Sequence, residues 1–394
     1  MAKNLTCPYC YGSFSAREIM FRCDMRVSPT RPQCAPARDE VLAAFTGTSR
    51  ELGPVFKDDG RKLHGTCPDC GMQTRHRVCP HSHHRLPAQF GMVGHQMLAM
   101  VGAADSGKTV YMTVLIHELM NRVGERLDAS LMGADDETVK RFASGYEDKL
   151  YEHGEIPKKT ERAAARGGQV DPLVFRLSLP ARGRLRSAPQ HTVLSFFDGA
   201  GEDFESQASR DVNARYLANA DGIILILDPR RMPGARRAAS LSAPADGDTD
   251  VASPLNSLSG VTELLLDQPG AVSAGRIKVP LAVVVTKIDE VSHTLDRGSP
   301  LLTEPAGGRM YDSSDGMDVH LEMSRLLRDW DGVSINQILE KHYHNYRLFG
   351  ISALGRRPTV DNDVDEAGIQ PFRAADPFVW LLSELGAVGR TARK

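Results

Sequence analysis

The sequence has no cysteine after residue 79, although the chain is 394 residues long. Aromatic residues make up only 6% of it, and no apolar run approaches the roughly 20 residues needed to span a bilayer. The formal net charge is −2, so the whole molecule offers no field that would attract nucleic acid. No segment resembles a signal peptide. These absences argue against a disulfide-rich secreted scaffold and a membrane protein, and they predict a cytoplasmic location.

The remaining composition predicts an ordinary globular protein. Hydrophobic residues make up 41% and charged residues 25%, which is enough for two domains and one large core. We expect a small domain over residues 1–90 and a large one over 95–388. Local basic clusters at 75–77, 81–85 and 182–186 are interpreted chiefly as solvated charges. With few aromatic residues among them, they give only weak support for a nucleic-acid partner.

Residues 102–109 have the sequence GAADSGKT, a full match to G-x-x-x-x-G-K-[ST]. A short apolar run at 97–101 precedes the match, and apolar residues at helical spacing follow it, which is the strand–loop–helix context this motif needs. Glycines let successive N–H groups turn toward a phosphate. Lys108 would contact the β- and γ-phosphates, and Thr109 would ligate Mg²⁺. The expected phosphate-binding residues are Gly102, Asp105, Ser106, Gly107, Lys108 and Thr109.

Three further short motifs follow, each at the end of a predicted strand. Asp198 begins D-x-x-G, where it would hold Mg²⁺ through a water while the Gly201 N–H meets the γ-phosphate. The next strand ends in T-K-x-D, whose carboxylate can accept two hydrogen bonds from guanine. The last ends in S-A-L, where a backbone N–H would meet guanine O6. The base-binding candidates are therefore Thr286, Lys287, Asp289, Ser352, Ala353 and Leu354.

Four such motifs in this order resemble the P-loop GTPases of the Ras-like and translation-factor-like (TRAFAC) class. The resemblance implies an α/β fold with a doubly wound, mostly parallel sheet, and GTP or GDP with Mg²⁺ at the carboxyl ends of its strands. Two positions depart from the pattern. Thr286 stands where asparagine is commoner, and Glu202 stands where Ras-like enzymes carry a glutamine that orients the attacking water. An ionised glutamate cannot donate a hydrogen bond, so we expect slow unaided hydrolysis.

The first switch of such a GTPase requires a threonine ahead of the strand that ends at Asp198. We select Thr160, which lies in a polar stretch between 124 and 170 that we expect to be mobile. An exposed loop threonine without a role is the equally weighted alternative. The expected catalytic residues are thus Lys108, Thr160, Gly201 and Glu202. We also expect the strands at 172–180 and 191–198 to form an antiparallel edge of the sheet.

The seven cysteines of residues 1–79 predict two zinc sites of the zinc-ribbon type. Two C-P-x-C knuckles start at residues 7 and 67, and a third, starting at residue 79, has Ser82 in place of its second cysteine. One histidine would complete eight ligands, with His81 or His84 favoured and His83 interpreted as solvated. In a local pairing, Cys7, Cys10, Cys23 and Cys34 would bind one zinc, and Cys67, Cys70, Cys79 and a histidine would bind the other. A cross-braced pairing is the alternative, and both remain open. The candidate ligands are Cys7, Cys10, Cys23, Cys34, Cys67, Cys70, Cys79, His81 and His84.

Two polar insertions interrupt the large domain. Residues 229–257 are rich in Pro, Ala, Arg, Ser and Asp, and residues 290–315 are rich in Gly and Ser. Such stretches bury little apolar surface, so we expect both to be mobile. Helices are expected at about 317–330 and 334–345, and another near the carboxyl terminus.

A zinc-ribbon head on a GTPase domain of this form resembles the bacterial double-GTPase proteins associated with conflict or defence operons. The resemblance implies a nucleotide-controlled switch or assembly factor with partner proteins. A nucleotide-dependent dimer is a further expectation, because a second copy could supply the arginine that this site lacks. The alternative is a scaffold that holds nucleotide structurally and recruits protein or nucleic acid through its zinc head.

Overall fold

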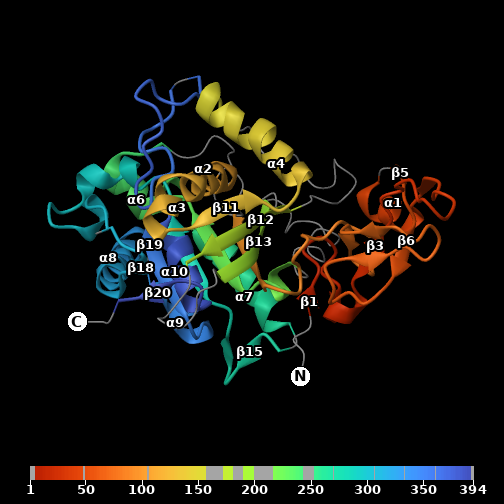
Figure 1. The fold of residues 1–394 in the computed structure, drawn as a ribbon. Coiled ribbons are helices and arrows are strands. Elements are labelled where there is room, and N and C mark those ends of the chain that lie inside the picture. The colour runs from red at the N-terminus through yellow and green to blue at the C-terminus, as the bar shows by residue number, and fades with distance from the viewer. Residues whose placement is uncertain are drawn as a thin grey trace.

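The centre of the fold is a seven-stranded, mostly parallel sheet (Figure 1). The computed structural model describes residues 5–47, 49–103, 106–156, 172–180, 190–198, 216–242, 253–268, 270–305, 307–331, 333–359 and 361–391. The strands of the sheet, in spatial order, are β11 (Ser130–Gly133), β12 (Leu173–Leu179), β13 (Gln190–Asp198), β10 (Gly94–Gly102), β14 (Gly222–Leu227), β17 (Leu281–Val285) and β19 (Tyr346–Gly350). From β13 to β19 the neighbours are parallel, whereas β12 is antiparallel to both strands beside it.

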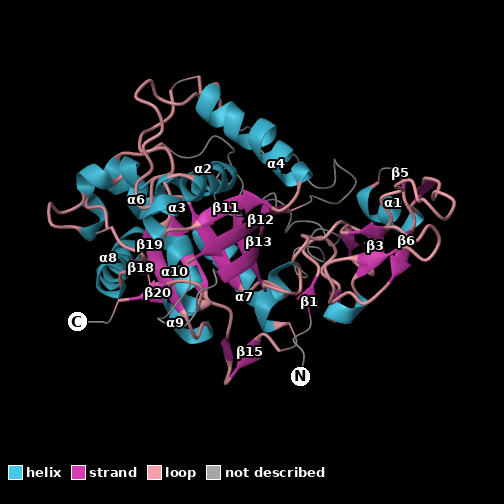
Figure 2. Ribbon diagram, in the orientation of Figure 1, coloured by secondary structure: helices cyan, strands magenta, loops and turns pink. Residues whose placement is uncertain are grey.

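The chain winds from β10 toward both edges of the sheet. One crossover leads from β10 toward β11–β13, and later crossovers lead from β14 to β17 and then to β19. Because such connections are right-handed, crossovers in opposite directions place their helices on opposite faces. The sheet is therefore doubly wound, as predicted, with helices covering it on both sides (Figure 2). The direction of winding reverses beside β10, which is where sheets of this kind bind ligands.

The central strands β14 and β17 carry no polar side chain, as expected of strands covered on both faces. Every residue of β14 and β17 is buried. In α10 the consecutive residues from Pro377 to Ser383 are buried too, because that helix lies against β14, β17 and β19. The helices of this part of the chain are α2 (Lys108–Met120), α3 (Arg122–Leu127), α4 (Asp136–Phe142), α6 (Pro233–Ala239), α7 (Pro254–Leu266), α8 (Ser313–Asp331), α9 (Ser334–His342) and α10 (Asp376–Glu384).

Several segments expected to be irregular form regular structure instead. Within 124–170, residues as far as 152 form α3, β11, α4 and a π-helical segment, Ala143–Glu152, so β11 rather than β12 is the edge strand. The expected antiparallel pairing of β12 with β13 is confirmed. In the 229–257 insertion, residues 229–239 form a short 3₁₀ helix and α6, and α7 begins at Pro254. In the 290–315 insertion, 3₁₀ turns and β18 (Met310–Tyr311) replace the expected loop.

The remaining pairs of strands are short. A hairpin joins β15 (Val272–Ser273) to β16 (Arg276–Ile277), and β18 pairs with β20 (Gly389–Arg390) near the carboxyl terminus. Short 3₁₀ helices lie at Pro229–Arg231, Ile288–Glu290, Ser292–Thr294 and Pro300–Leu302.

Residues 5–93, called the head below, project from one side of the sheet (Figure 1). Their strands have two or three residues each, which is too little for a self-sufficient core. The head contains a 3₁₀ helix Ala16–Glu18, helix α1 (Glu40–Thr46) and strands β1 (Leu5–Thr6), β2 (Ser13–Phe14), β3 (Met20–Arg22), β4 (Ala37–Arg38), β5 (Glu51–Leu52), β6 (Val55–Lys57), β7 (Gly65–Thr66), β8 (Gln73–Thr74) and β9 (Arg77–Val78).

The head packs directly on β12 and β13. Val174 of β12 and Val193 of β13 belong to the same buried cluster as Cys7, Tyr9 and Phe90 of the head. The Tyr9 hydroxyl donates to Asp135 Oδ2 at 3.3 Å, and the Tyr9 ring is buried. The head therefore contacts the strand that ends at Asp198.

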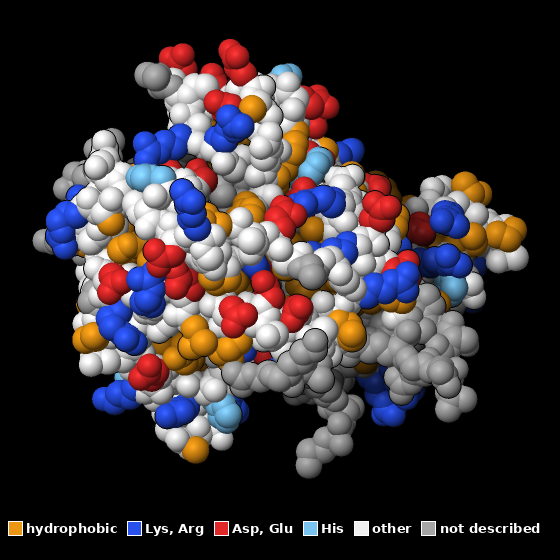
Figure 3. Space-filling model, turned by 90° about the vertical axis from the view of Figure 1, so that its left-hand side faces the viewer, with side chains coloured by type: hydrophobic (Ala, Val, Ile, Leu, Met, Phe, Trp, Pro, Cys, Tyr) orange, Lys and Arg blue, Asp and Glu red, His pale blue; other side chains and the backbone are white. Residues whose placement is uncertain are grey.

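The surface shows no strong excess of either charge on the face drawn in Figure 3, where acidic and basic side chains alternate with small apolar patches. This agrees with the net charge of −2. Among the residues that the structure describes, no helix is both long enough and apolar enough to cross a membrane.

Candidate functional site

The sheet brings the four motifs to one edge. Gly102 lies in register with Ile226, two residues beyond the pairing of Met100 with Asp198. On the other side, Val285 is paired with Gly350. Because parallel strands end at the same edge, β10, β13, β17 and β19 end together, at the edge where sheets of this kind bind a ligand in a crevice.

The phosphate-binding loop has the backbone that its glycines predict. Gly107 has φ +89°, a left-handed conformation that L side chains rarely adopt, and it precedes α2. At Gly102 a Cβ atom would lie 2.6 Å from the Ile226 carbonyl oxygen, so the close approach of β14 requires glycine. The amino-terminal N–H groups of α2 have no partner within the helix and carry its positive dipole end, which together favour an anion.

Lys108 begins α2 and is almost completely buried. Its Nζ donates to the carbonyl oxygens of Gly102 and Ala103, at 3.0 and 3.2 Å. These contacts hold the ammonium group at the loop. Thr109 follows in the first turn, at the position expected for a Mg²⁺ ligand, and the side chain of the loop residue Ser106 is buried.

Thr286 joins the base motif to the phosphate loop. Its hydroxyl donates to the Ser106 carbonyl at 3.0 Å, and the side chain is buried. The backbone of the same motif is fixed by the Ile288 N–H, which donates to Ile351 O at 3.0 Å, and by the Ile351 N–H, which donates to Val285 O at 2.9 Å. The threonine found where asparagine is commoner thus makes a direct contact with the phosphate loop in this chain.

Asp289 and Ser352 lie together at the base end of the crevice. Burial raises the pKa of the Asp289 carboxyl, and a hydrogen bond from the Ser352 side chain opposes that rise. The Ser352 Oγ also accepts from the Gly355 N–H at 2.8 Å, while its own N–H donates to Phe372 O at 3.0 Å. Ala353 and Leu354 follow as half-buried residues packed on the core.

Two buried carboxylates missed by the sequence analysis support the base motif. Asp228, at the end of β14, accepts from Lys287 Nζ at 2.5 Å. Glu290 forms a two-point ion pair with Arg230, through Nε at 2.8 Å and a shorter contact from Nη2. Asp228 could have been suspected, because it too follows an apolar strand. The Arg230–Glu290 pair joins residues 60 positions apart and left no signal in the sequence.

The phosphate-binding loop is hydrogen-bonded to a motif typical of guanine binding, at one edge of a doubly wound sheet. This arrangement can bind a nucleoside triphosphate. The sequence model of the Double-GTPase 2 family matches residues 96–311, which is more than half of the chain. The chain belongs to the Double-GTPase 2 family. It is therefore a P-loop GTPase by family, and the expectation drawn from the motifs is confirmed.

One curated protein is similar to this Double-GTPase 2 protein over nearly the whole chain, and solved structures are similar to about three quarters of it. The proposed ESX-1 scaffolding and assembly protein SaeC of Mycolicibacterium smegmatis is 29% identical over 410 residues, covering 97% of this chain and 99% of the relative. Among solved structures, the small GTPase Arl6 of Trypanosoma brucei with bound GppNp is 12% identical and covers 74% of this chain and 98% of its own, with a TM-score of 0.29. The Ski7 GTPase-like domain of S. cerevisiae, bound to GDP and inorganic phosphate, is 13% identical. The match covers 74% of this chain and 50% of the Ski7 chain, with a TM-score of 0.34.

Some predicted site residues of this Double-GTPase 2 protein lie outside the described residues. They are Asp105, Thr160, Gly201 and Glu202. For Asp198 the structure gives the backbone position at the end of β13. Their roles in binding Mg²⁺ and the γ-phosphate stay predictions.

The cysteines gather into two groups, and their arrangement is nested, so neither the local nor the cross-braced pairing is found: the first knuckle joins the third, and the second knuckle joins Cys23 and Cys34 between them. Ligand atoms within 4.8 Å of one another define site 1 (Cys7, Cys10, Cys79) and site 2 (Cys23, Cys34, Cys67, Cys70). The shortest Sγ–Sγ distances are 3.6 Å between Cys23 and Cys70 and 3.7 Å between Cys10 and Cys79. Burial raises the pKa of the Cys7 thiol well above its usual range. Clustered thiols with little access to water suit a metal of the zinc type.

Neither favoured histidine joins site 1 in the described part of the chain. The exposed His81 ring has its Nε2 3.2 Å from Ser13 O. The His84 ring is buried, with its Nδ1 3.0 Å from Ser82 Oγ. His83, interpreted as solvated, instead places Nδ1 2.9 Å from both carboxylate oxygens of Asp39. Cys23 and Cys34, which lack a neighbouring cysteine in the sequence, both belong to site 2.

Proposed function

We propose that this protein is a GTP-binding switch that uses Mg²⁺, hydrolyses GTP slowly and acts as an assembly factor for partner proteins. Its head would bind two zinc ions and respond to the nucleotide state. Thr109 and Asp198 would hold Mg²⁺, with Thr160 and Gly201 ordered by the γ-phosphate. The name of the mycobacterial relative, a scaffolding and assembly protein, supports this reading over a role in a conflict system.

The observation that carries the proposal is the contact between the head and the strands beside the nucleotide site. Site 1 residue Cys7 shares a buried cluster with Val174 and Val193. The Tyr11 ring lies 5.9 Å from the Tyr216 ring. The Tyr216 hydroxyl donates to Leu98 O at 2.8 Å, on the strand that leads into the phosphate loop. A conformational change at the nucleotide site can therefore reach the head through side chains in direct contact.

Slow hydrolysis is expected because glutamate follows Gly201 and no motif fixes an arginine at the site. An arginine supplied by another molecule is worth about 10³–10⁵ in kcat. We therefore expect low turnover per molecule that rises with protein concentration, if a second copy brings Arg162 or Arg166, or on addition of a partner. Phosphate release under multiple turnover measures this. Fast turnover that is independent of concentration and is lost in Glu202→Gln would make Glu202 catalytic and contradict the slow switch.

A scaffold that holds nucleotide structurally is the second candidate, and coupling between head and nucleotide separates the two. Tyr11 has φ +57°, a conformation that asparagine tolerates, so Tyr11→Asn removes the ring with little backbone strain. An aromatic pair contributes about 0.5–1.5 kcal/mol, so we expect the ratio of GTP to GDP affinity to change by about 2–10-fold.

Isothermal titration with GDP and a non-hydrolysable GTP analogue measures the ratio. Val27→Ala is the matched control, because Val27 lies on the head with 77% of its surface exposed. Binding linkage is reciprocal, so a head that responds to nucleotide must influence nucleotide affinity in return. An unchanged ratio in Tyr11→Asn would favour the scaffold.

A further inference from the structure

Three turns of the head share one backbone geometry. They span 7–12, 67–72 and 79–84. In each, the N–H of the first residue donates to the carbonyl of the sixth, and the N–H of the fifth donates back to the carbonyl of the first, at 2.9–3.0 Å. The fifth residue is left-handed in all three, with φ of 57° at Tyr11, 75° at Gly71 and 55° at His83. The third turn is therefore built like the two C-P-x-C knuckles.

Ser82 occupies the position of the second cysteine in this third turn. It corresponds to Cys10 in the first knuckle and to Cys70 in the second. The Ser82 side chain is completely buried, with an exposed fraction of 0%. Because the three turns share their hydrogen bonds and their left-handed residue, the Ser82 side chain takes the place in this turn that the second thiol takes in the other two. Site 1 thus has three sulfurs and one oxygen where site 2 has four sulfurs.

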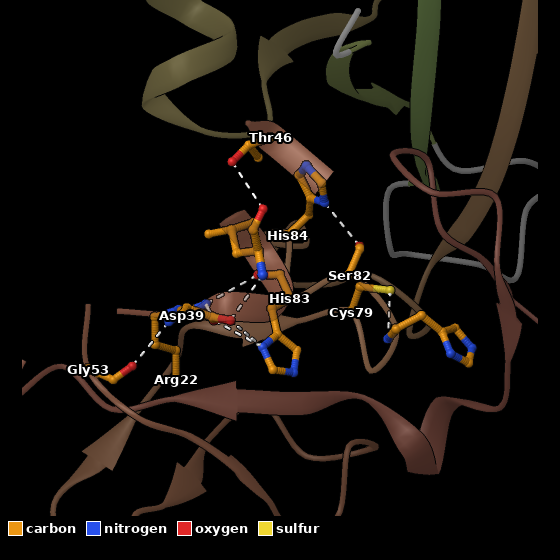
Figure 4. A network of polar contacts seen from close by, with 10 residues as sticks. Arg22, Asp39, Thr46, Gly53, Cys79, Ser82, His83 and His84 are labelled. Carbon is orange, nitrogen blue, oxygen red and sulfur yellow. Dashed lines mark hydrogen bonds and ion pairs between the residues drawn. The ribbon is translucent and has the colours of Figure 1, made fainter. Parts of the chain in front are cut away.

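His84 holds the Ser82 hydroxyl, with its Nδ1 3.0 Å from Ser82 Oγ (Figure 4). The His84 ring stacks on Tyr9 at a centroid distance of 4.8 Å and an interplanar angle of 3°, and its edge meets Phe45. These contacts leave the imidazole little rotational freedom. Next to it, His83 is held by Asp39, which also pairs with Arg22 at 2.6 Å. The turn is therefore fixed on both sides of Ser82.

We propose that Ser82 supplies the fourth, oxygen donor of a Cys₃Ser zinc centre at site 1, and that His84 is its positioning residue. This inference rests on the proposed zinc binding of the head. Zinc accepts oxygen as well as sulfur and nitrogen donors in tetrahedral sites. Three thiolates and a neutral hydroxyl leave Zn²⁺ with a net charge of −1, whereas four thiolates leave −2. With one soft thiolate fewer, site 1 releases zinc faster than site 2.

X-ray absorption at the zinc edge of the full chain tests the ligand set without any substitution. For two bound zinc ions we expect seven sulfur ligands and one oxygen ligand, and eight sulfurs in Ser82→Cys. A single imidazole ligand in the wild-type protein, lost in His81→Ala or in His84→Phe, would overturn the proposal. So would an unchanged number of sulfurs in Ser82→Cys. Zinc content separates this failure from failure of the head proposal, since a histidine ligand still gives two zinc ions per chain.

Zinc release to a chelator tests the positioning role. The wild-type protein should release its two ions in a fast and a slow phase, and Ser82→Cys should slow the fast phase. His84→Phe keeps the ring that stacks on Tyr9 but removes the contact with Ser82. Because such outer partners typically alter metal affinity by about 10–100-fold, we expect the fast phase to accelerate to that extent. His81→Ala is the control and should change neither phase. An unchanged fast phase in His84→Phe would contradict the role of His84.

Discussion

Replacing Lys108 with alanine is expected to abolish tight GTP binding. The Lys108 ammonium is buried and held at the phosphate loop by two backbone carbonyls, so a phosphate bound there meets a charge already in place. Removal of one partner from a buried charged pair costs about 2–5 kcal/mol, and affinity should fall by about 30- to 5,000-fold. Isothermal titration of GTP in the presence of Mg²⁺ measures the change.

Two further variants show whether the loss of GTP affinity in Lys108→Ala comes from the contact with the phosphates. Lys341→Ala removes an exposed lysine of α9 and should leave GTP affinity unchanged. Asp289→Asn alters the base end of the crevice, where a carboxamide can donate to O2 of xanthine. It should weaken GTP while permitting xanthosine triphosphate to bind. Unchanged GTP affinity in Lys108→Ala would refute the phosphate-loop assignment, and equal competition by ATP in the wild-type protein would refute the guanine assignment.

Local sequence patterns were sufficient where a strand and its motif lie next to each other. The runs 97–101, 222–227 and 281–285, which lie in β10, β14 and β17, are apolar and are followed by glycine or polar residues, so both the parallel sheet and its ligand-binding edge could be predicted. The antiparallel β12–β13 pair was predicted from the resemblance to P-loop GTPases, in which such a pair is expected. The strands β10, β13 and β17 each lie directly before a motif in the sequence, whereas the pairing of the strands joins distant residues, such as Met97 with Ser195.

Features that depend on distant contacts were missed. The segment of α6 has the composition of a loop, yet Gly234 fits so closely against α8 that a Cβ there would lie 2.5 Å from Trp330 Cα. Nothing near residue 234 in the sequence indicates that contact. The grouping of the cysteines could not be predicted for the same reason, because Cys23 and Cys70 are 47 positions apart and only the fold of the head brings them together. The position of Ser82 was visible in the sequence, but its complete burial and its contact with His84 were not.

Zinc removal is expected to unfold the head while the nucleotide site survives. The head has short strands, and one of its two buried clusters consists of Phe21, Phe56 and three cysteines of site 2. Without a metal, nothing but these few side chains would hold that cluster together. Structural zinc in small domains contributes about 10–16 kcal/mol of binding free energy that is also folding free energy. Elemental analysis should find two zinc ions per chain.

Hydrogen exchange after chelation separates the two parts of the chain. Peptides from residues 5–93 should lose protection, while those of β10, β14 and β17 should keep it, because these strands are buried by their own helices. The strands β12 and β13 should lose some protection, since Val174 and Val193 pack against the head. GTP should still bind, with an altered preference over GDP if the head responds to the nucleotide. A head that stays protected without zinc, or native protein in which all seven cysteines react as free thiols, would show that the cysteines are packing residues and not metal ligands.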